Sequence, residues 1–318
     1  MRLLAALMLA AAAPAAAAPV ESFVEAPGPV GTLKGTMLAA GPDAPVVLII
    51  PGSGPTDRDG NNARGIAGSI YRQLADSLAA RGISSVRIDK RGMFASGDAV
   101  RDPDAVTLSD YATDVRSWTA TIRQNTGVPC VWLLGHSEGG LVALIAAKKG
   151  GDFCGLVLLE TAGRPLGQTL RDEFKANPAM APVLKQAMAA LATLEAGKPV
   201  DTTNMSPVLL PLFRPEVQKF VIDVLAYDPG ALLSGYPRPV LILQGDRDLQ
   251  LAPEDARRLQ KSDPKARLVT LPGVNHVLKQ VASADRAANV ATYANPAVPI
   301  APSVVEAIAG FVEAAKGP

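Results

Sequence analysis

The stretch from Val131 to Ala143 constrains the fold most, because an apolar run there leads through Gly-x-Ser-x-Gly into residues that favour a helix. The serine of this motif is Ser137, and its glycines are Gly135 and Gly139. Glycine has no Cβ, so a strand and a helix can approach closely across a strained turn that holds the serine hydroxyl above the sheet. Unpaired N–H groups and the positive end of the helix dipole favour an oxyanion at the same point. The stretch therefore predicts a nucleophilic serine.

Apolar runs and helical periodicity alternate along most of the chain. The predicted strands are Val30–Leu38, Val46–Ile50, Ser85–Ile88, Val131–Leu134, Gly155–Leu159, Pro239–Leu243 and Arg267–Leu271. The predicted helices are Ile66–Ala80, Leu108–Asn125, a helix after Ser137 that runs to Lys149, and helices near Pro253–Lys261 and Pro302–Ala315. Strands that alternate with helices predict an α/β fold with a mostly parallel, doubly wound sheet and right-handed crossovers.

Composition changes between residues 164 and 236, which are rich in Ala, Leu, Met and Pro and contain no predicted strand. We expect residues 19–163 and 237–318 to form the core, and residues 164–236 to form a helical lid inserted over the site. Candidates for the lid's part of a pocket wall are Met180, Met188, Met205, Leu209, Leu210 and Phe213. For any single one of them, packing between the insertion's own helices is the favoured interpretation.

Residues 1–18 have one positive charge, an apolar centre and small residues at the end, which predicts a secretory signal peptide and a periplasmic or secreted protein. No cysteine follows to carry a lipid, so we expect no stable membrane anchor. Cys130 and Cys154 begin two predicted neighbouring strands, and an oxidising compartment favours a disulfide between them over two buried thiols. Two cysteines and two histidines disfavour a structural zinc site, so no metal is expected.

A serine nucleophile needs a base, normally a histidine that a carboxylate orients. His136 is adjacent to Ser137, where side chains diverge, so His276 is the predicted base by elimination. The orienting acid should lie between the serine and the histidine, at the end of a strand. Asp248 is the preferred candidate, because Asp246 directly follows Gly245 and is better placed to shape the turn. Glu160, which follows the preceding strand, is a third candidate.

The loop Pro51-Gly52-Ser53-Gly54-Pro55 directly follows a predicted buried strand. Small residues at such a point expose backbone N–H groups, so the amides of Ser53 and Glu138 are the predicted oxyanion hole. Arg58, in the next loop, could bind an acidic substrate group, although a salt bridge with Asp57 or Asp59 is the favoured interpretation.

The order Ser137, Asp248, His276, together with the loop at Ser53 and the insertion, resembles the α/β-hydrolase superfamily. The run Asp89-Lys90-Arg91-Gly92, together with residues 51–55 and 57–59, makes the chain more narrowly similar to bacterial carboxylesterases related to serine-aminopeptidase-like hydrolases. Such relatives usually have histidine where Pro51 stands, which should alter the support of the oxyanion loop but not its backbone donor. The resemblance implies hydrolysis of short or medium acyl esters without a cofactor.

The predicted function is therefore that of a serine esterase with a small-molecule ester substrate and an acyl-enzyme intermediate. A formal net charge of +1, with interspersed charges, argues against nucleic acid as a partner. One alternative is an amidase or exopeptidase with the same triad, for which Asp172 and Glu173 are the carboxylate pair available in the lid. The other alternative is a non-catalytic binding protein on this fold.

Overall fold

The computed structural model describes residues 18–63 and 65–315. Residues 1–17, which make up nearly all of the predicted signal peptide, lie outside the described residues. No helix within the two described ranges is both long enough and apolar enough to cross a membrane.

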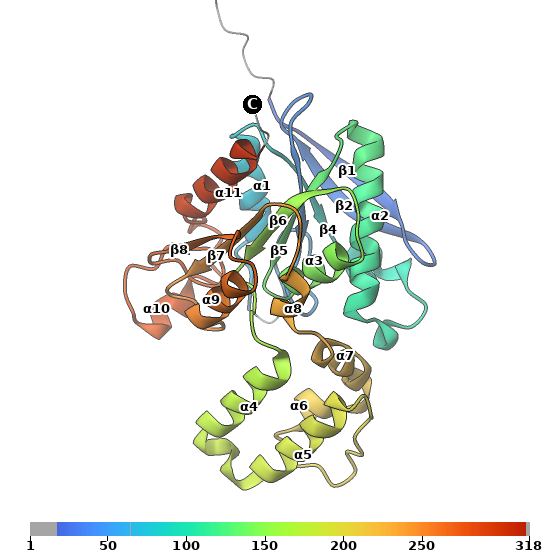
Figure 1. Ribbon diagram of the computed structural model, residues 1–318, viewed down its shortest axis with the longest axis vertical. Coiled ribbons are helices and arrows are strands. Elements are labelled where there is room, and N and C mark those ends of the chain that lie inside the picture. Colours follow the sequence, from blue (N-terminus) through green and yellow to red (C-terminus); the bar gives the residue numbers. More distant parts are fainter. Residues whose placement is uncertain (1–17, 64, 316–318) are drawn as a thin grey trace, which may run out of the picture.

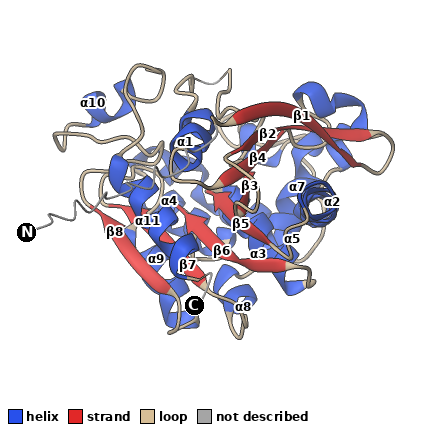
Figure 2. Ribbon diagram, turned by 90° about the horizontal axis from the view of Figure 1, so that it is seen from above, coloured by secondary structure: helices blue, strands red, loops and turns tan. Residues whose placement is uncertain are grey.

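Within the described residues, eight strands form one sheet in the order β1-β2-β4-β3-β5-β6-β7-β8 (Figures 1 and 2). The strands are β1 Val20–Pro27, β2 Thr32–Ala39, β3 Val46–Ile50, β4 Ser84–Ile88, β5 Val131–His136, β6 Phe153–Leu159, β7 Val240–Gly245 and β8 Arg267–Leu271. From β4 to β8 all neighbours are parallel, whereas β1 pairs with β2, and β2 with β4, in antiparallel fashion. The predicted α/β fold with a mostly parallel sheet is confirmed.

Helices cover both faces of the sheet. One face packs against α2 Leu108–Thr126, α3 Glu138–Lys148, α8 Pro229–Leu233 and α9 Pro253–Ser262. The other face packs against α1 Ile70–Ala79 and α11 Pro302–Ala314. Strands β3 and β7 are buried along their whole length, which explains the continuous apolar runs at Val46–Ile50 and at residues 240–243. This two-sided packing fixes the carboxyl ends of the strands in one row.

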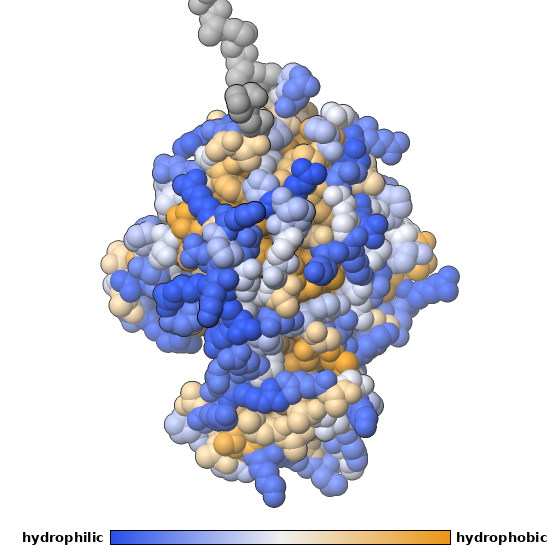
Figure 3. All heavy atoms as spheres, in the orientation of Figure 1, coloured by the Kyte–Doolittle hydropathy of each residue, from blue (hydrophilic) through white to orange (hydrophobic). Residues whose placement is uncertain are grey.

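A helical insertion connects β6 to β7 and forms the lower lobe in Figure 1. Its helices are α4 Leu166–Ala176, α5 Leu184–Glu195, α6 Leu210–Phe213 and α7 Pro215–Leu225, followed by α8 beside the sheet. These helices enclose an apolar cluster of their own around Leu191 and Phe213. Figure 3 shows hydrophilic residues spread over this face, with a hydrophobic group where the lower lobe meets the sheet core.

The remaining helices are short. They are α10 Arg286–Ala291 and the 3-10 helices η1 Phe94–Ala99, η2 Pro103–Ala105 and η3 Pro178–Val183. Two sequence predictions were incomplete: β1 and α10 were not expected, and α1 begins at Ile70 rather than Ile66. Ser69, the residue before α1, has a φ of 47°, which lies outside the right-handed helical region, so the helix cannot begin earlier.

The two cysteines lie at the edge of the sheet where β5 and β6 begin. Cys130 immediately precedes β5, Cys154 is the second residue of β6, and a disulfide joins them across a Cα–Cα distance of 5.1 Å. Because the strands are parallel, this bond lies at the opposite edge from the carboxyl ends of the strands.

Candidate active site

Ser137 lies on the turn between β5 and α3 and has φ of 55° and ψ of −122°, a conformation that non-glycine residues rarely adopt. The flanking glycines make this turn sterically feasible. A Cβ on Gly135 would lie 2.2 Å from the Gly139 carbonyl oxygen, and one on Gly139 would lie 2.2 Å from that of Ile50. The turn therefore requires glycine at both positions and projects the serine at the edge of the sheet.

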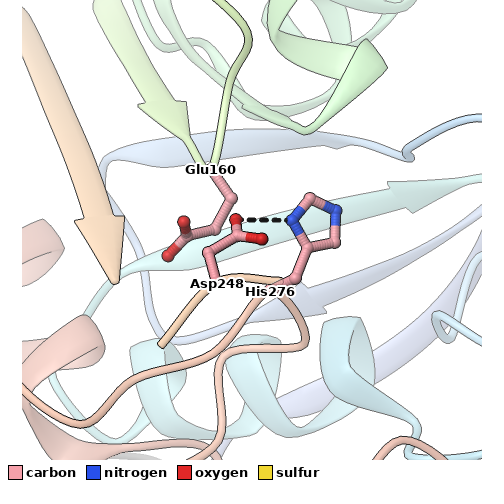
Figure 4. Close-up of side chains that lie close together, drawn as sticks. All are labelled: Glu160, Asp248 and His276. Carbon is pink, nitrogen blue, oxygen red and sulfur yellow. Dashed lines mark hydrogen bonds and ion pairs between the residues drawn. The ribbon is translucent and has the colours of Figure 1, made fainter. Parts of the chain in front are cut away.

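His276 and Asp248 are brought together from the loops after β8 and β7. The Nδ1 atom of His276 lies 2.7 Å from Oδ2 of Asp248, and both side chains are buried (Figure 4). The other oxygen, Oδ1, accepts hydrogen bonds from the amides of Gln250 and Leu251, at 2.6 and 3.0 Å. Burial acts to raise the pKa of Asp248, but the hydrogen bond and charge of His276 outweigh it and lower the pKa to about 2. Asp248 is therefore an ionised carboxylate that can orient the imidazole.

Asp246 has a different role. Its Oδ1 atom accepts a hydrogen bond from the Gly273 amide at 2.7 Å, and its side chain is 41% exposed. The carboxylate thus joins the turn after β7 to the turn after β8, in the structural role that the sequence suggested for it.

Glu160 lies beside Asp248, with its carboxyl group on the side away from the His276 ring (Figure 4). It is fully buried, and its carboxyl oxygens accept hydrogen bonds from the Gly245 amide at 2.8 Å and the Gln244 side-chain amide at 2.7 Å. Burial raises the pKa of Glu160 well above its usual value, and the negative charge of Asp248 raises it further. The negative charge of the two carboxyl groups therefore resides on Asp248.

Glu160, Asp248 and His276 place three potential metal-ligand atoms within 4.8 Å of one another. The carboxyl oxygens of Glu160 and Asp248, however, already accept hydrogen bonds from the protein, and the Nδ1 atom of His276 faces Asp248. The donor set is thus arranged as an acid–base network around the imidazole.

Ser137 and His276 line the same cavity of about 180 Å³, together with Gly52 and Ser53. Within the described residues, no hydrogen bond joins the side chains of Ser137 and His276. Serine–histidine contacts are often longer in free enzymes and tighten when substrate binds. In the structure, His276 therefore contacts Asp248 directly, whereas its relation to Ser137 is that both side chains line one cavity.

The two amides predicted to bind an oxyanion are available for it. Glu138 is the first residue of α3, so its N–H has no partner within the helix. Neither this amide nor that of Ser53 donates a hydrogen bond to any described residue. Ser53, Ser137 and Glu138 together line a second cavity of about 380 Å³.

His136 lines the same cavity as Ser137 and His276, and both of its ring nitrogens form hydrogen bonds to other segments of the chain. Its Nε2 atom lies 2.8 Å from the His276 carbonyl oxygen, which can only accept, so Nε2 carries the hydrogen. Its Nδ1 atom then accepts from the Tyr71 hydroxyl at 2.8 Å, and that hydroxyl accepts from the Gly52 amide at 2.9 Å. Burial, followed by the charge of His276, lowers the pKa of His136 to about 3. A neutral ring therefore connects the loop at Ser53 to the backbone of the predicted base.

The wall of the larger cavity comes partly from the insertion, through Leu212, Phe220, Val221 and Val224. None of the six wall candidates from the sequence is among the described residues that line it. Met180, Met205, Leu209 and Phe213 are buried in the insertion's own cluster, and Leu210 packs against that cluster. Their apolar side chains serve the packing of the lobe, which was the favoured interpretation.

Arg58 has a partner that the sequence did not indicate. Its guanidinium binds Asp89 through Nη2 at 2.6 Å and Nε at 3.0 Å, and not the adjacent Asp57 or Asp59. The expected salt bridge exists but its predicted partner was wrong, because the loop after β3 packs on the loop after the neighbouring strand β4. Tyr71 and Glu160 are further residues around the site whose contacts the sequence did not reveal.

Comparisons with known proteins agree with this architecture. Residues 46–292 match the family model described as the alpha/beta hydrolase family. The esterase EstD of Thermotoga maritima is 27% identical over 243 residues, which are 74% of this chain and 54% of that protein. The chain thus spans about half the length of this curated relative.

Two solved structures share the fold. Est1E from Butyrivibrio proteoclasticus superposes with a TM-score of 0.57 at 17% identity. The superposition covers 92% of this chain and 98% of the Est1E chain. A thermophilic esterase from Thermogutta terrifontis superposes with a TM-score of 0.56 at 19% identity. The superposition covers 93% of this chain and 100% of the esterase chain. Because the family model matches more than half of its residues, the chain belongs to the α/β-hydrolase family.

Proposed function

We propose that the protein is a serine esterase that hydrolyses carboxylic esters with short or medium acyl chains. One observation carries this proposal: the strained Ser137, the His276–Asp248 pair and two unpaired amides meet at one edge of the sheet. The 27% identity to a protein named as an esterase supports the same reaction class.

In the proposed mechanism, His276 removes the hydroxyl proton of Ser137 while the serine oxygen attacks the ester carbonyl carbon. The carbonyl oxygen becomes an oxyanion that accepts hydrogen bonds from the amides of Ser53 and Glu138. Asp248 holds the imidazole with Nδ1–H towards its carboxylate and stabilises the imidazolium. His276 then protonates the leaving alcohol, and the acyl group remains on Ser137.

In the second half of the reaction, His276 removes a proton from water, which attacks the acyl-enzyme carbonyl. The second tetrahedral intermediate uses the same two amides, and its collapse returns the proton to Ser137 and releases the carboxylic acid. No cofactor is needed, because each step is a proton transfer or an acyl transfer between these groups.

The apolar wall of the 380 Å³ cavity supports an acyl chain as the group bound there. Phe220, Val221 and Val224 present apolar side chains to it, and we propose that the insertion acts as a lid over this cavity. A volume of this size favours a small acyl group over a large, rigid one.

An amidase is the second candidate, because Glu173 also lines this cavity and could bind a substrate amine. Its neighbour Asp172 faces Arg164 instead, at 3.5 Å. Hydrolysis of aminoacyl-nitroanilides that exceeds hydrolysis of the corresponding esters would favour this candidate.

We also propose that the protein acts after export. The disulfide between Cys130 and Cys154 supports an oxidising compartment such as the periplasm. Fractionation of cells that express the full chain, followed by mass determination of the mature N-terminus, tests this proposal.

The proposed reaction is tested with p-nitrophenyl acetate and butyrate and with a fluorophosphonate probe. The wild type should hydrolyse both esters, and the probe should label Ser137. Ser137→Ala should lose labelling and fall to the background rate while keeping the wild-type circular dichroism spectrum. Equal turnover by the wild type and the folded variant would remove Ser137 from the mechanism.

A further inference from the structure

The Gly52–Ser53 peptide unit contains the N–H that the proposed mechanism assigns to the oxyanion hole. Its carbonyl oxygen, that of Gly52, accepts a hydrogen bond from Nζ of Lys90 at 2.7 Å. In a trans peptide the C=O and N–H bonds of one unit point in opposite directions. A contact that fixes the Gly52 carbonyl therefore also fixes the direction of the Ser53 N–H.

The topology of the sheet explains why Lys90 reaches this peptide. Gly52 follows β3 and Lys90 follows β4, and these strands are parallel neighbours, so their carboxyl ends lie side by side. Lys90 is 4% exposed, and its ammonium group lies 5.2 Å from the centre of the Tyr111 ring. Burial lowers the pKa of Lys90, and the charge of Glu138 opposes this shift.

Lys90 also contacts the residue that supplies the other oxyanion donor. Its Nζ atom lies 3.5 Å from Oε1 of Glu138, the first residue of α3. On the other side of the loop, the Gly52 amide donates to the Tyr71 hydroxyl. The peptide units on both sides of Gly52 are thus each fixed by a hydrogen bond, whereas the Ser53 N–H donates to no described residue and Ser53 lines the same cavity as Ser137.

We propose that Lys90 is a positioning residue that orients the Ser53 amide and strengthens it as a hydrogen-bond donor to the reaction's oxyanion. A cation at a carbonyl oxygen draws electron density through the amide, so the N–H of the same peptide unit becomes more positive. This effect matters most in the transition state, when the substrate oxygen carries negative charge. The proposal rests on the serine-esterase function proposed above.

A positioning role predicts a specific kinetic change. Lys90→Met removes the donor but keeps an unbranched buried side chain of similar length. We expect kcat on p-nitrophenyl butyrate to fall by about 10- to 100-fold, below the full loss typical of a deleted oxyanion donor. KM should stay within about threefold, because the ground-state ester carries little charge on this oxygen.

A trifluoromethyl ketone provides the second measurement, because its adduct with serine carries an oxyanion. Its affinity should fall in Lys90→Met by about the same factor as kcat. Lys90→Gln, which keeps an N–H donor but no charge, should fall between Lys90→Met and the wild type.

Lys279→Met is the matched control. Lys279 is also fully buried, and its ammonium also donates to a backbone carbonyl, that of Asn295. It lies outside both cavities described above, so its loss should lower the melting temperature while kcat stays within about twofold of the wild type.

A folded Lys90→Met variant with wild-type kcat and wild-type ketone affinity would overturn the proposal. If Lys90→Met does not fold, Lys90→Gln decides: a wild-type kcat in that variant rejects a role of the charge. A wild type that neither hydrolyses esters nor reacts with fluorophosphonate would reject the esterase function, and this inference with it. In an active wild type, the lysine variants test Lys90 alone.

Discussion

The sheet core and the helical insertion differ in how they treat polar and apolar groups. At the carboxyl edge of the sheet, buried polar side chains such as Glu160, His136 and Lys90 have hydrogen-bond partners that fix their positions. The insertion instead packs apolar side chains against each other and presents another apolar set to the cavity. Under the proposed function, the core carries out the chemistry and the insertion fits the substrate. Substitutions in the two regions should therefore affect different kinetic parameters.

The largest effect should come from the carboxylate that contacts His276. Asp248→Asn leaves the imidazole in the wrong tautomer and should lower kcat by roughly 10³- to 10⁴-fold. Asp246→Asn, a substitution two residues away at a partly exposed site, should stay within about threefold. Steady-state kinetics on p-nitrophenyl butyrate compares the two. A larger loss in Asp246→Asn would reverse the assignment of the acid.

His136 should make the core sensitive to acid. Its pKa is lowered to about 3 in the folded protein, from about 6.5 when unfolded, so the unfolded chain binds more protons between these values. Stability should therefore rise with pH across this window, with a slope from this one group of at most about 1.4 kcal/mol per pH unit.

The measurement is urea unfolding at several pH values between 4 and 7, for the wild type and for His136→Gln, whose side chain does not titrate. The variant should show a flatter dependence of the unfolding free energy on pH. Parallel curves would mean that His136 is not the group responsible.

The disulfide should stabilise the core without affecting the chemistry. It joins residues separated by 24 positions, and closing a loop of this length stabilises the fold by about 3.5 kcal/mol. The double variant Cys130→Ser and Cys154→Ser should lose about that much in urea unfolding. Since the bond lies at the opposite edge of the sheet from Ser137, kcat should not change. A change in kcat beyond about twofold would contradict the idea that the disulfide acts on stability alone.

The smallest effect should come from the insertion and should concern specificity. Phe220→Ala enlarges the cavity, so the ratio of kcat/KM for octanoate to butyrate esters should rise about tenfold. Phe213→Leu, in the insertion's own cluster, is the matched control, and it should lower the melting temperature while leaving this ratio unchanged. An unchanged ratio in Phe220→Ala would remove the insertion from substrate selection.

The sequence predicted well what depends on local pattern. A continuous apolar run located β3 to the residue, the bounds of β8 were also predicted correctly, and helix α2 begins where Thr107 forms a capping box with Asp110. The predicted triad members Ser137, Asp248 and His276 all follow strand ends, so the topology of a parallel sheet was enough to propose them together. Their catalytic roles stay predictions.

Contacts between distant segments could not be predicted in this way. The partner of Arg58 is Asp89, because β3 and β4 are neighbours, and strand order does not follow from composition. Strand β1 escaped notice because most of its side chains are exposed, which leaves no alternation to detect. The sequence offered Phe213 as a wall candidate while favouring internal packing for it, and it did not single out Phe220, because composition does not show which helix side faces the cavity.

The chain of hydrogen bonds from Gly52 through Tyr71 and His136 to the carbonyl of His276 has only one allowed direction. The Gly52 amide can only donate and the His276 carbonyl can only accept, so the donor and acceptor roles of the groups between them cannot be exchanged. An added proton on His136 would set its Nδ1–H against the hydroxyl hydrogen of Tyr71, and that hydroxyl could then no longer donate to the ring. Acid would thus loosen the loop at Ser53 and the loop of His276 together, through the protonation of one buried ring.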